Sequence, residues 1–191
     1  VEYNPGVSPG QYAIYGYSAT GGGSENLPLW LKLEVVAVSG KEVTLRITVQ
    51  MAQGGMPPSD SVWNVETGAM DGNATCMAMV MAANLNQGDA VPPEECELAI
   101  NKTETRTYLG AKRTVNVIMT DSEWMGKWTR VYDKETGMLL EMVTEMDSNT
   151  QTCSITETNL FPSTPIPEPS IAVLAAAFMA IVASTSTRRR N

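Results

Sequence analysis

The sequence contains no histidine among its 191 residues. Without an imidazole, the chain cannot build a Ser-His-Asp or Cys-His catalytic arrangement, and it lacks the commonest metal ligand of proteins. It also has no phosphate-binding loop and no dinucleotide-binding glycine motif, because its densest glycine cluster, 21–23, lies in a serine-containing loop with no helix expected after it. We therefore predict no catalytic residues, no cofactor and no metal site, and a protein that is not an enzyme.

Basic residues are also scarce. The chain has 13 lysines and arginines against 21 aspartates and glutamates, a formal net charge of −8. Binding to duplex nucleic acid requires a basic surface, so nucleic acid is excluded as a partner. We interpret the acidity as a property of a soluble surface that resists association. With 43% hydrophobic residues, a chain of this length can form one folded domain with a sizeable core.

Cysteine is limited to three residues, and no two of them form a C-x-x-C pair. In an exported protein this number predicts one disulfide and one free thiol. Cys76 and Cys96, which bracket a methionine-rich stretch, are the favoured pair, and a pairing of Cys96 with Cys153 stays open. A nucleophilic cysteine has little support because no histidine is present to form a thiolate pair.

The end of the chain is its most distinctive part. An uncharged, alanine-rich run at 170–187 is followed at once by Arg188, Arg189 and Arg190. As a helix this run would span about 27 Å, close to the roughly 30 Å hydrocarbon core of a bilayer. It has no polar stripe of the kind that a buried C-terminal helix would carry, and a proline-rich stretch separates it from the rest. We predict a membrane-spanning helix that the arginines hold on the cytoplasmic side, so the preceding chain lies outside.

The residues before this helix include Pro167, Glu168 and Pro169. A Pro-Glu-Pro motif, an apolar helix and a terminal arginine cluster, in this order, resemble the PEP-CTERM sorting signals that exosortases and archaeosortases recognise. The resemblance covers 167–191, and the helix is richer in alanine and methionine than those of many family members. It implies that a membrane enzyme of this class processes the chain near the motif, with Pro167, Glu168 and Pro169 as the recognition element, and transfers or releases the domain at the cell surface.

This organisation divides the chain into four parts: an extracytoplasmic β domain at 1–161, a proline-rich linker with the motif at 162–169, a transmembrane or sorting helix at 170–187 and a basic cytoplasmic tail at 188–191. We expect a cleaved export signal upstream of Val1.

The predicted extracytoplasmic domain has the pattern of antiparallel β structure. Apolar and polar residues alternate from Val43 to Met51, which indicates a half-buried strand, and the short loop 39–42 joins this strand to another at 30–38. Further strands are predicted at 12–17, 104–108, 113–119, 127–132, 138–144 and 152–160. About eight to ten strands predict a mainly β fold, either an antiparallel sandwich or a strongly curved half-barrel sheet.

The stretch 74–84 interrupts the β pattern. Its alanines and methionines favour a helix, and Gly88 suits a helix end, so we predict one short helix on the sheet. Met77, Met79 and Met81 alternate along it. Thioethers bind Cu(I), but methionine more commonly fills irregular gaps in a core. A third interpretation places these three methionines around an apolar cavity between helix and sheet, as lining for an apolar ligand.

Two sequons begin at Asn73 and Asn101, which would be N-glycosylation sites if the organism modifies exported proteins. Glu94, Glu95 and Glu97 form an acidic cluster that we interpret as a solvated turn in preference to a calcium site or an acid–base pair. Four tryptophans are expected to anchor the core in preference to lining a carbohydrate or peptide groove: Trp30, Trp63, Trp124 and Trp128.

The triplet Glu-Thr-Gly occurs at 66–68 and again at 135–137, each time after a strand that contains an aromatic residue. Either turn chemistry or an internal duplication would produce this repeat, and we favour turn chemistry.

Together these features predict an exported, membrane-anchored cell-surface protein with a binding, scaffolding or coat-forming role. Its expected partners are the membrane, an exosortase-like enzyme, and either a surface polysaccharide or further copies of itself. The alternative is a carrier of a lipid or other apolar ligand in the cavity of a curved sheet, which is an inference from fold alone. A hydrolase that uses Glu94 or Glu95 is a third and weaker hypothesis.

Overall fold

The structure is a computed structural model of the chain, and it describes residues 1–21, 27–122, 126–146 and 149–162. The Pro-Glu-Pro motif, the membrane helix, the arginine cluster and Trp124 lie outside these residues. The predicted mainly β, antiparallel fold is confirmed. Within the described ranges, no helix combines the length and the apolar character that a membrane crossing needs.

One twelve-stranded sheet forms most of the domain, with neighbouring strands in the order β10-β11-β12-β13-β14-β1-β2-β3-β5-β6-β7 and with β4 paired to β3. The last described strand, β14, therefore lies between β13 and the first strand. The strands are β1 (Tyr12–Thr20), β2 (Trp30–Ser39), β3 (Glu42–Met51), β4 (Gly54–Gly55), β5 (Ser59–Asn64), β6 (Ala69–Met70), β7 (Asn73–Ala74), β10 (Lys102–Tyr108), β11 (Ala111–Ser122), β12 (Gly126–Asp133), β13 (Leu139–Met146) and β14 (Asn149–Thr158). A separate two-stranded sheet pairs β8 (Ala90–Val91) with β9 (Leu98–Ala99).

The alternation that predicted the strands also determines which side chains are buried. On β3, Val43 and Leu45 are fully buried, and Arg46 is exposed on the opposite face. The predicted hairpin between β2 and β3 is present, and its turn residue Gly40 has a φ of 58°, a left-handed conformation that glycine adopts at little cost.

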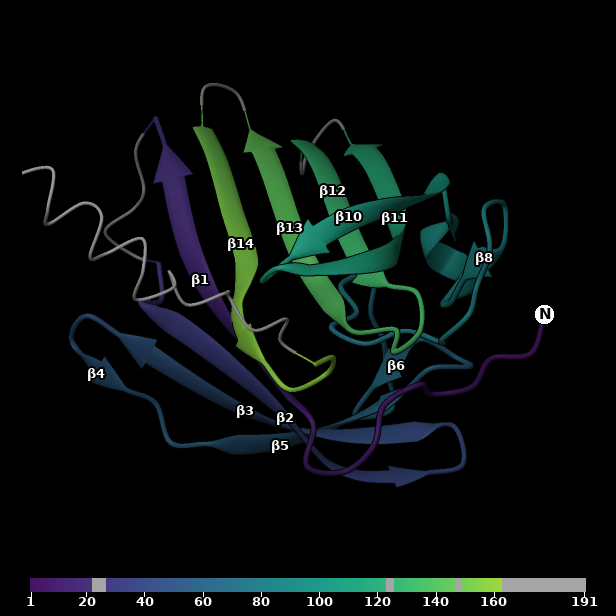
Figure 1. Cartoon of the computed structure of the whole chain (residues 1–191), viewed down its shortest axis with the longest axis horizontal. Coiled ribbons are helices and arrows are strands. Elements are labelled where there is room, and N and C mark those ends of the chain that lie inside the picture. Colours follow the sequence, from purple (N-terminus) through teal and green to yellow (C-terminus); the bar gives the residue numbers. More distant parts are fainter. Residues whose placement is uncertain (22–26, 123–125, 147–148, 163–191) are drawn as a thin grey trace, which may run out of the picture.

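The sheet is continuous and bends. Figure 1 shows β1, β14, β13, β12 and β11 side by side in one limb, with β2, β3 and β5 forming a second limb below them. Register shifts interrupt the pairing on β1, β2 and β12, and bulges of this kind increase the local bend of a strand. The core lies on the inner side of the bend, where Tyr15 is fully buried and donates a hydrogen bond of 2.7 Å to the carbonyl oxygen of Leu139.

The predicted helix at 74–84 is wrong. Residues 75–101, which we name the crossing segment, run from β7 to β10 and contain the β8–β9 pair and one 3₁₀ turn, Glu94–Cys96. The crossing segment inserts apolar side chains into the core: Val80, Met81, Ala82, Leu85, Val91, Leu98 and Ile100.

Hydrogen bonds to other parts of the chain explain why no helix forms. The backbone nitrogen of Met81 donates to Gly137 at 3.0 Å, and that of Ala83 donates to Asn4 at 2.8 Å. The carbonyl oxygen of Met79 accepts a bond of 3.0 Å from the backbone nitrogen of Leu139. These groups would bond within the segment in a helix, so the tertiary contacts override the helix preference of alanine and methionine.

The two Glu-Thr-Gly triplets form equivalent turns. In the turn after β5, the side-chain oxygen of Asn64 accepts a bond of 3.1 Å from the backbone nitrogen of Thr67, and Gly68 donates to the Asn64 carbonyl at 2.9 Å. In the turn after β12, Asp133 accepts from Thr136 at 3.0 Å and from Gly137 at 2.8 Å in the same way. Both glycines have positive φ, as this turn requires.

Candidate binding site at Arg130

Arg130 is buried on β12 without a negatively charged partner. Only 3% of the residue is exposed, and no aspartate or glutamate among the described residues forms an ion pair with it. The other three arginines of the described ranges, Arg46, Arg106 and Arg113, all do. Burial of an uncompensated cation costs several kcal/mol by general estimates, which makes Arg130 the most unusual charged residue of the domain.

The alternation of β12 explains why this guanidinium is inside. Trp128, Arg130 and Tyr132 occupy alternate positions and therefore share one face of the strand. The neighbouring strands place Ile118 and Met142 opposite Arg130. The cation thus lies on the inner, largely apolar face of the sheet.

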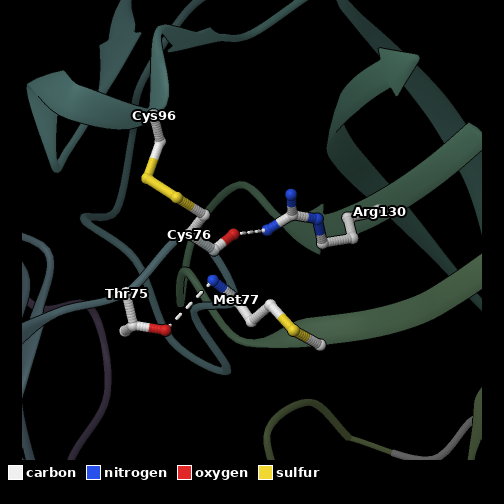
Figure 2. The surroundings of a disulfide bond; sticks show 5 residues. All are labelled: Thr75, Cys76, Met77, Cys96 and Arg130. Atoms are coloured by element: carbon white, nitrogen blue, oxygen red, sulfur yellow. Dashed lines mark hydrogen bonds between the residues drawn. A yellow bond between two sulfur atoms is a disulfide. The ribbon is translucent and has the colours of Figure 1, made fainter. Parts of the chain in front are cut away.

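Two contacts and one unpartnered nitrogen describe the surroundings of the guanidinium. Nη1 donates a hydrogen bond to the carbonyl oxygen of Cys76, and the guanidinium carbon lies 5.5 Å from the centre of the Trp128 ring, within cation–π range. Nε is buried and has no hydrogen-bond partner. Figure 2 shows one terminal nitrogen directed at Cys76 and the other directed away from it. Protein groups therefore satisfy the guanidinium only in part.

Tyr132 supports this arrangement from the same face of β12. Its hydroxyl donates a hydrogen bond of 2.8 Å to the carbonyl oxygen of Ala78 in the crossing segment. Burial raises the pKa of Tyr132, and the neighbouring Arg130 cation opposes this rise. The hydroxyl therefore stays protonated near neutral pH and fixes the crossing segment above the strand.

The favoured disulfide, between Cys76 and Cys96, is present, with the two Cα atoms 5.6 Å apart. It joins two points of the crossing segment that are 20 residues apart. Cys153 is a free, buried thiol on β14, so the alternative pairing with Cys96 is wrong. Because Cys76 also contacts Arg130, the disulfide holds the crossing segment against the buried cation (Figure 2).

A cavity of about 310 Å³ lies at this point of the structure. Arg130 and the disulfide border it, together with apolar groups of Trp128, Met77 and Leu98. Its border also includes the exposed Glu97, and Asp121, whose side chain lies on the opposite face of β11 together with that of Lys127. The volume is at the lower limit for small-molecule sites, which range from about 300 to 1,000 Å³.

Comparison with known proteins adds no further constraint on this site. No protein-family model matches the chain, and no curated protein matches its sequence. The interpretation of the site therefore rests on its own geometry.

The three methionines predicted to line an apolar cavity do not lie together in one. Met77 is 43% exposed and borders the Arg130 cavity. Met79 is partly buried against the core. Met81 is buried and borders only a space of about 10 Å³, which Trp63 also borders. Two of the three are therefore packing residues.

The acidic cluster lies at the 3₁₀ turn, where Glu94, Glu95 and Glu97 are all exposed. These residues and Glu66 border a second cavity, of about 620 Å³, at the side of the crossing segment. In the part of the chain that the structure describes, no group of three or more acidic or cysteine side chains is placed to hold a metal ion.

Both sequons are accessible, since Asn73 on β7 and Asn101 before β10 are exposed. Their glycosylation stays a prediction. Among the tryptophans, Trp63 is a core residue with 5% exposure, and Trp30 and Trp128 are half-buried.

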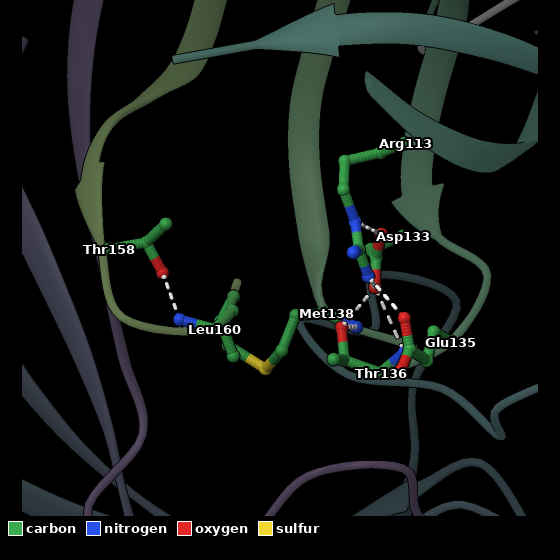
Figure 3. A network of polar contacts seen from close by, with 7 residues as sticks. All are labelled: Arg113, Asp133, Glu135, Thr136, Met138, Thr158 and Leu160. Carbon is green, nitrogen blue, oxygen red and sulfur yellow. Dashed lines mark hydrogen bonds and ion pairs between the residues drawn. The ribbon is translucent and has the colours of Figure 1, made fainter. Parts of the chain in front are cut away.

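A second polar cluster, at the β12–β13 turn, is saturated by its own contacts. The carboxylate of Asp133, which is fully buried, accepts two hydrogen bonds from Arg113, at 2.8 and 3.0 Å. It also accepts from the backbone nitrogen and the hydroxyl of Thr136, as Figure 3 shows. Glu135 binds the same guanidinium at 2.7 Å, and the ring of Phe161 lies 4.9 Å from it. This cluster stabilises a turn, and both oxygens of the buried Asp133 carboxylate are occupied by its own contacts.

Arg130 was not among the residues that the sequence singled out. The signal was present in the segment 127–132, where one arginine lies between an aromatic residue two positions before it and another two positions after it. A charge on an otherwise apolar face of a predicted strand is the pattern that identifies it.

Proposed function

We propose that the protein is an exported, membrane-anchored β domain that binds a small ligand at the cell surface. The buried and unpaired guanidinium of Arg130, at the wall of a cavity, is the observation that carries the binding role. Charged side chains are almost never fully buried unless paired, and a cavity beside such a cation is where a ligand supplies the missing charge.

The extracytoplasmic location has two independent supports. The Cys76–Cys96 disulfide is of the kind that persists in oxidising compartments. The tail supplies the second, through its resemblance to a sorting signal and through the arginine cluster at 188–190. In this proposal Pro167, Glu168 and Pro169 are recognised by an exosortase-like enzyme, which processes the chain.

The carrier hypothesis has less support. The crossing segment fills the inner side of the sheet with its own side chains, including Val80 and Leu85. The larger of the two main cavities is bordered by four glutamates as well as by apolar residues. An acyl chain would find little apolar space in this part of the molecule.

Location is tested by protease treatment of cells that make the full chain. We expect the domain to be digested in intact cells while a cytoplasmic marker protein survives. A domain that resists until the cells are lysed would overturn the extracytoplasmic assignment. Replacement of Pro167, Glu168 and Pro169 by alanine tests sorting in the same cells: unchanged processing and unchanged surface retention would show that the motif is only a linker.

Ligand binding is tested by native mass spectrometry of the full chain released from detergent. We expect a small molecule to co-purify with the wild-type protein and to be lost from Arg130→Gln. Arg46→Gln is the matched control, because Arg46 forms an exposed ion pair with Asp60 away from the cavity. Equal ligand occupancy in the two variants would overturn the assignment of the site.

A further inference from the structure

The charges around the Arg130 cavity are of both signs, and their positions differ. The cation is buried in the wall, whereas the carboxylate of Glu97 is exposed at the border. Glu97 forms no ion pair among the described residues. The site therefore holds one unpaired positive charge inside and one unpaired negative charge at its border.

We propose that this cavity binds a zwitterionic amino acid or short peptide, with the ligand's carboxylate against Arg130 and its ammonium group toward Glu97. The proposal names the ligand class of the site and rests on the proposed binding function. It does not depend on where in the cell the domain lies.

The carboxylate is the part of the ligand that the guanidinium selects. Arginine binds carboxylates through charge-assisted hydrogen bonds, which are about twice as strong as neutral ones. The carbonyl of Cys76 occupies Nη1, whereas Nε has no hydrogen-bond partner. Part of the guanidinium is therefore available for a ligand. A bound carboxylate also supplies the negative charge that no protein group provides. This removes the free-energy cost of burying an unpaired cation.

The carboxylate at the border selects against other anions. A phosphate or sulfate group carries more negative charge than a carboxylate, and Glu97 would repel it more strongly. A ligand with an ammonium group gains from the same residue. This combination of charges is present in a free amino acid and is absent from a simple organic anion.

The apolar border selects the side chain of the ligand. Trp128 is half-buried, Met77 is largely exposed and Leu98 is buried, so an aromatic or branched aliphatic group has a surface to pack on. A cavity of about 310 Å³ suits a single amino acid or a dipeptide better than a lipid.

The test is isothermal titration of the full chain in detergent micelles with a matched series of probes. The series consists of L-phenylalanine, N-acetyl-L-phenylalanine without the ammonium charge, L-phenylalaninamide without the carboxylate, and inorganic phosphate. We expect L-phenylalanine to bind tightest and the amide weakest of the three organic probes. Equal affinity for the three organic probes, tighter binding of phosphate, or no binding of any amino acid up to 10 mM would each overturn the proposal.

Variants locate the site. Loss of a charge-assisted hydrogen bond predicts that Arg130→Gln weakens L-phenylalanine about ten- to a hundredfold. Glu97→Gln, on the surface, should weaken L-phenylalanine about two- to fivefold and leave the N-acetyl compound unchanged. Because the Glu97 variant changes only an exposed side chain, it keeps the test meaningful even if Arg130→Gln folds poorly. Unchanged L-phenylalanine affinity in both variants would overturn the assignment.

The outcome separates this inference from the proposed function. A different co-purifying ligand that depends on Arg130, together with no amino-acid binding, would overturn the zwitterion proposal and leave the binding function standing. No Arg130-dependent ligand of any kind would overturn both.

Discussion

The carbonyl oxygen of Cys76 accepts a hydrogen bond from Nη1 of Arg130, so a disulfide cysteine and a buried cation on a different part of the chain are in direct contact. The contact joins the crossing segment to the strand beneath it. The covalent bond, the cation and the cavity therefore form one structural unit.

Removing the disulfide tests this unit. In Cys76→Ser/Cys96→Ser, the closed loop of about 20 residues is lost, and the entropy of the unfolded chain rises accordingly. We expect the free energy of unfolding to fall by about 3 kcal/mol in urea titrations. Cys153→Ala, which leaves the disulfide intact, is the control. A double variant with the urea midpoint of the wild type would show that the bond contributes nothing to stability.

Gly137 offers a test of how closely the crossing segment packs on the sheet. Its φ is 73°, and a Cβ atom placed on it would lie 2.0 Å from the carbonyl oxygen of Met81. Gly88 also has a positive φ, of 91°, but nothing lies within 4 Å of such an atom. We expect Gly88→Ala to cost about 1 kcal/mol from backbone strain alone, and Gly137→Ala about 3 kcal/mol or more because backbone atoms must move. Equal costs in denaturant titrations would contradict the close approach.

Asp133 and Asp60 each bind an arginine through two hydrogen bonds, but they differ in burial. Asp133 is fully buried and the side chain of Arg113 is 15% exposed, whereas the Asp60–Arg46 pair is 44% and 45% exposed. Asp133→Ala leaves two Thr136 donors unsatisfied and leaves Arg113 with only its bond to the exposed Glu135, so we expect a loss of about 3 kcal/mol. Asp60→Ala should change stability little, because exposed ion pairs contribute little. Thermal unfolding of both variants measures the difference, and similar melting temperatures would contradict the structural role of Asp133.

Cys153 should be an inert thiol in the folded protein. It is a buried residue of β14, and burial raises its pKa to about 11, although a hydrogen bond from Tyr17 acts in the opposite direction. The thiolate is the reactive form, so a thiol reagent at pH 8 should label no cysteine in the native protein and one cysteine in denaturant. Rapid labelling without denaturant would show that the thiol is accessible.

The raised pKa of Cys153 predicts that the folded protein loses stability in alkali. This pKa rises from 9.0 to about 11 on folding, so the folded state holds the proton more tightly than the unfolded state does. The contribution of the thiol to the free energy of unfolding is therefore complete below about pH 9 and is lost as the pH rises toward 11. Burial also raises the pKa of Tyr15 and Tyr17, which extends the loss to higher pH.

Urea titrations between pH 7.5 and 10 measure this effect. Wild-type stability should decline more steeply above pH 8.5 than that of Cys153→Ala, which retains the tyrosines and lacks the thiol. Parallel curves would show that the thiol does not contribute.

The sequence predicted the strands well because their signal is local. The alternation at 43–51 reports one buried face, and the glycine of the 39–42 loop reports one turn conformation. Both are properties of a few consecutive residues. The pairing of β14 with β1 was outside this reasoning, because alternation identifies a face and says nothing about which strand lies beside it.

The crossing segment shows where local reasoning failed. Alanine and methionine favour a helix in isolation, but Met81 and Ala83 are held by hydrogen bonds to residues distant in sequence. The favoured cysteine pair was correct, although a separation of 20 residues does not by itself decide between it and the pairing of Cys96 with Cys153. The sequence marks Arg130 only as a charge on an apolar strand face, and the lack of an ion-pair partner, which makes the residue unusual, is visible only in the structure.

The position of β14 has a consequence for biogenesis. The strand completed last among those described joins the half of the sheet that contains β2 and β3 to the half that contains β11 and β12. Neither half has its full set of neighbours until residues 149–158 have left the ribosome. We therefore expect the two halves to pair only after β14 has been made, which agrees with the proposed export of the domain before it folds.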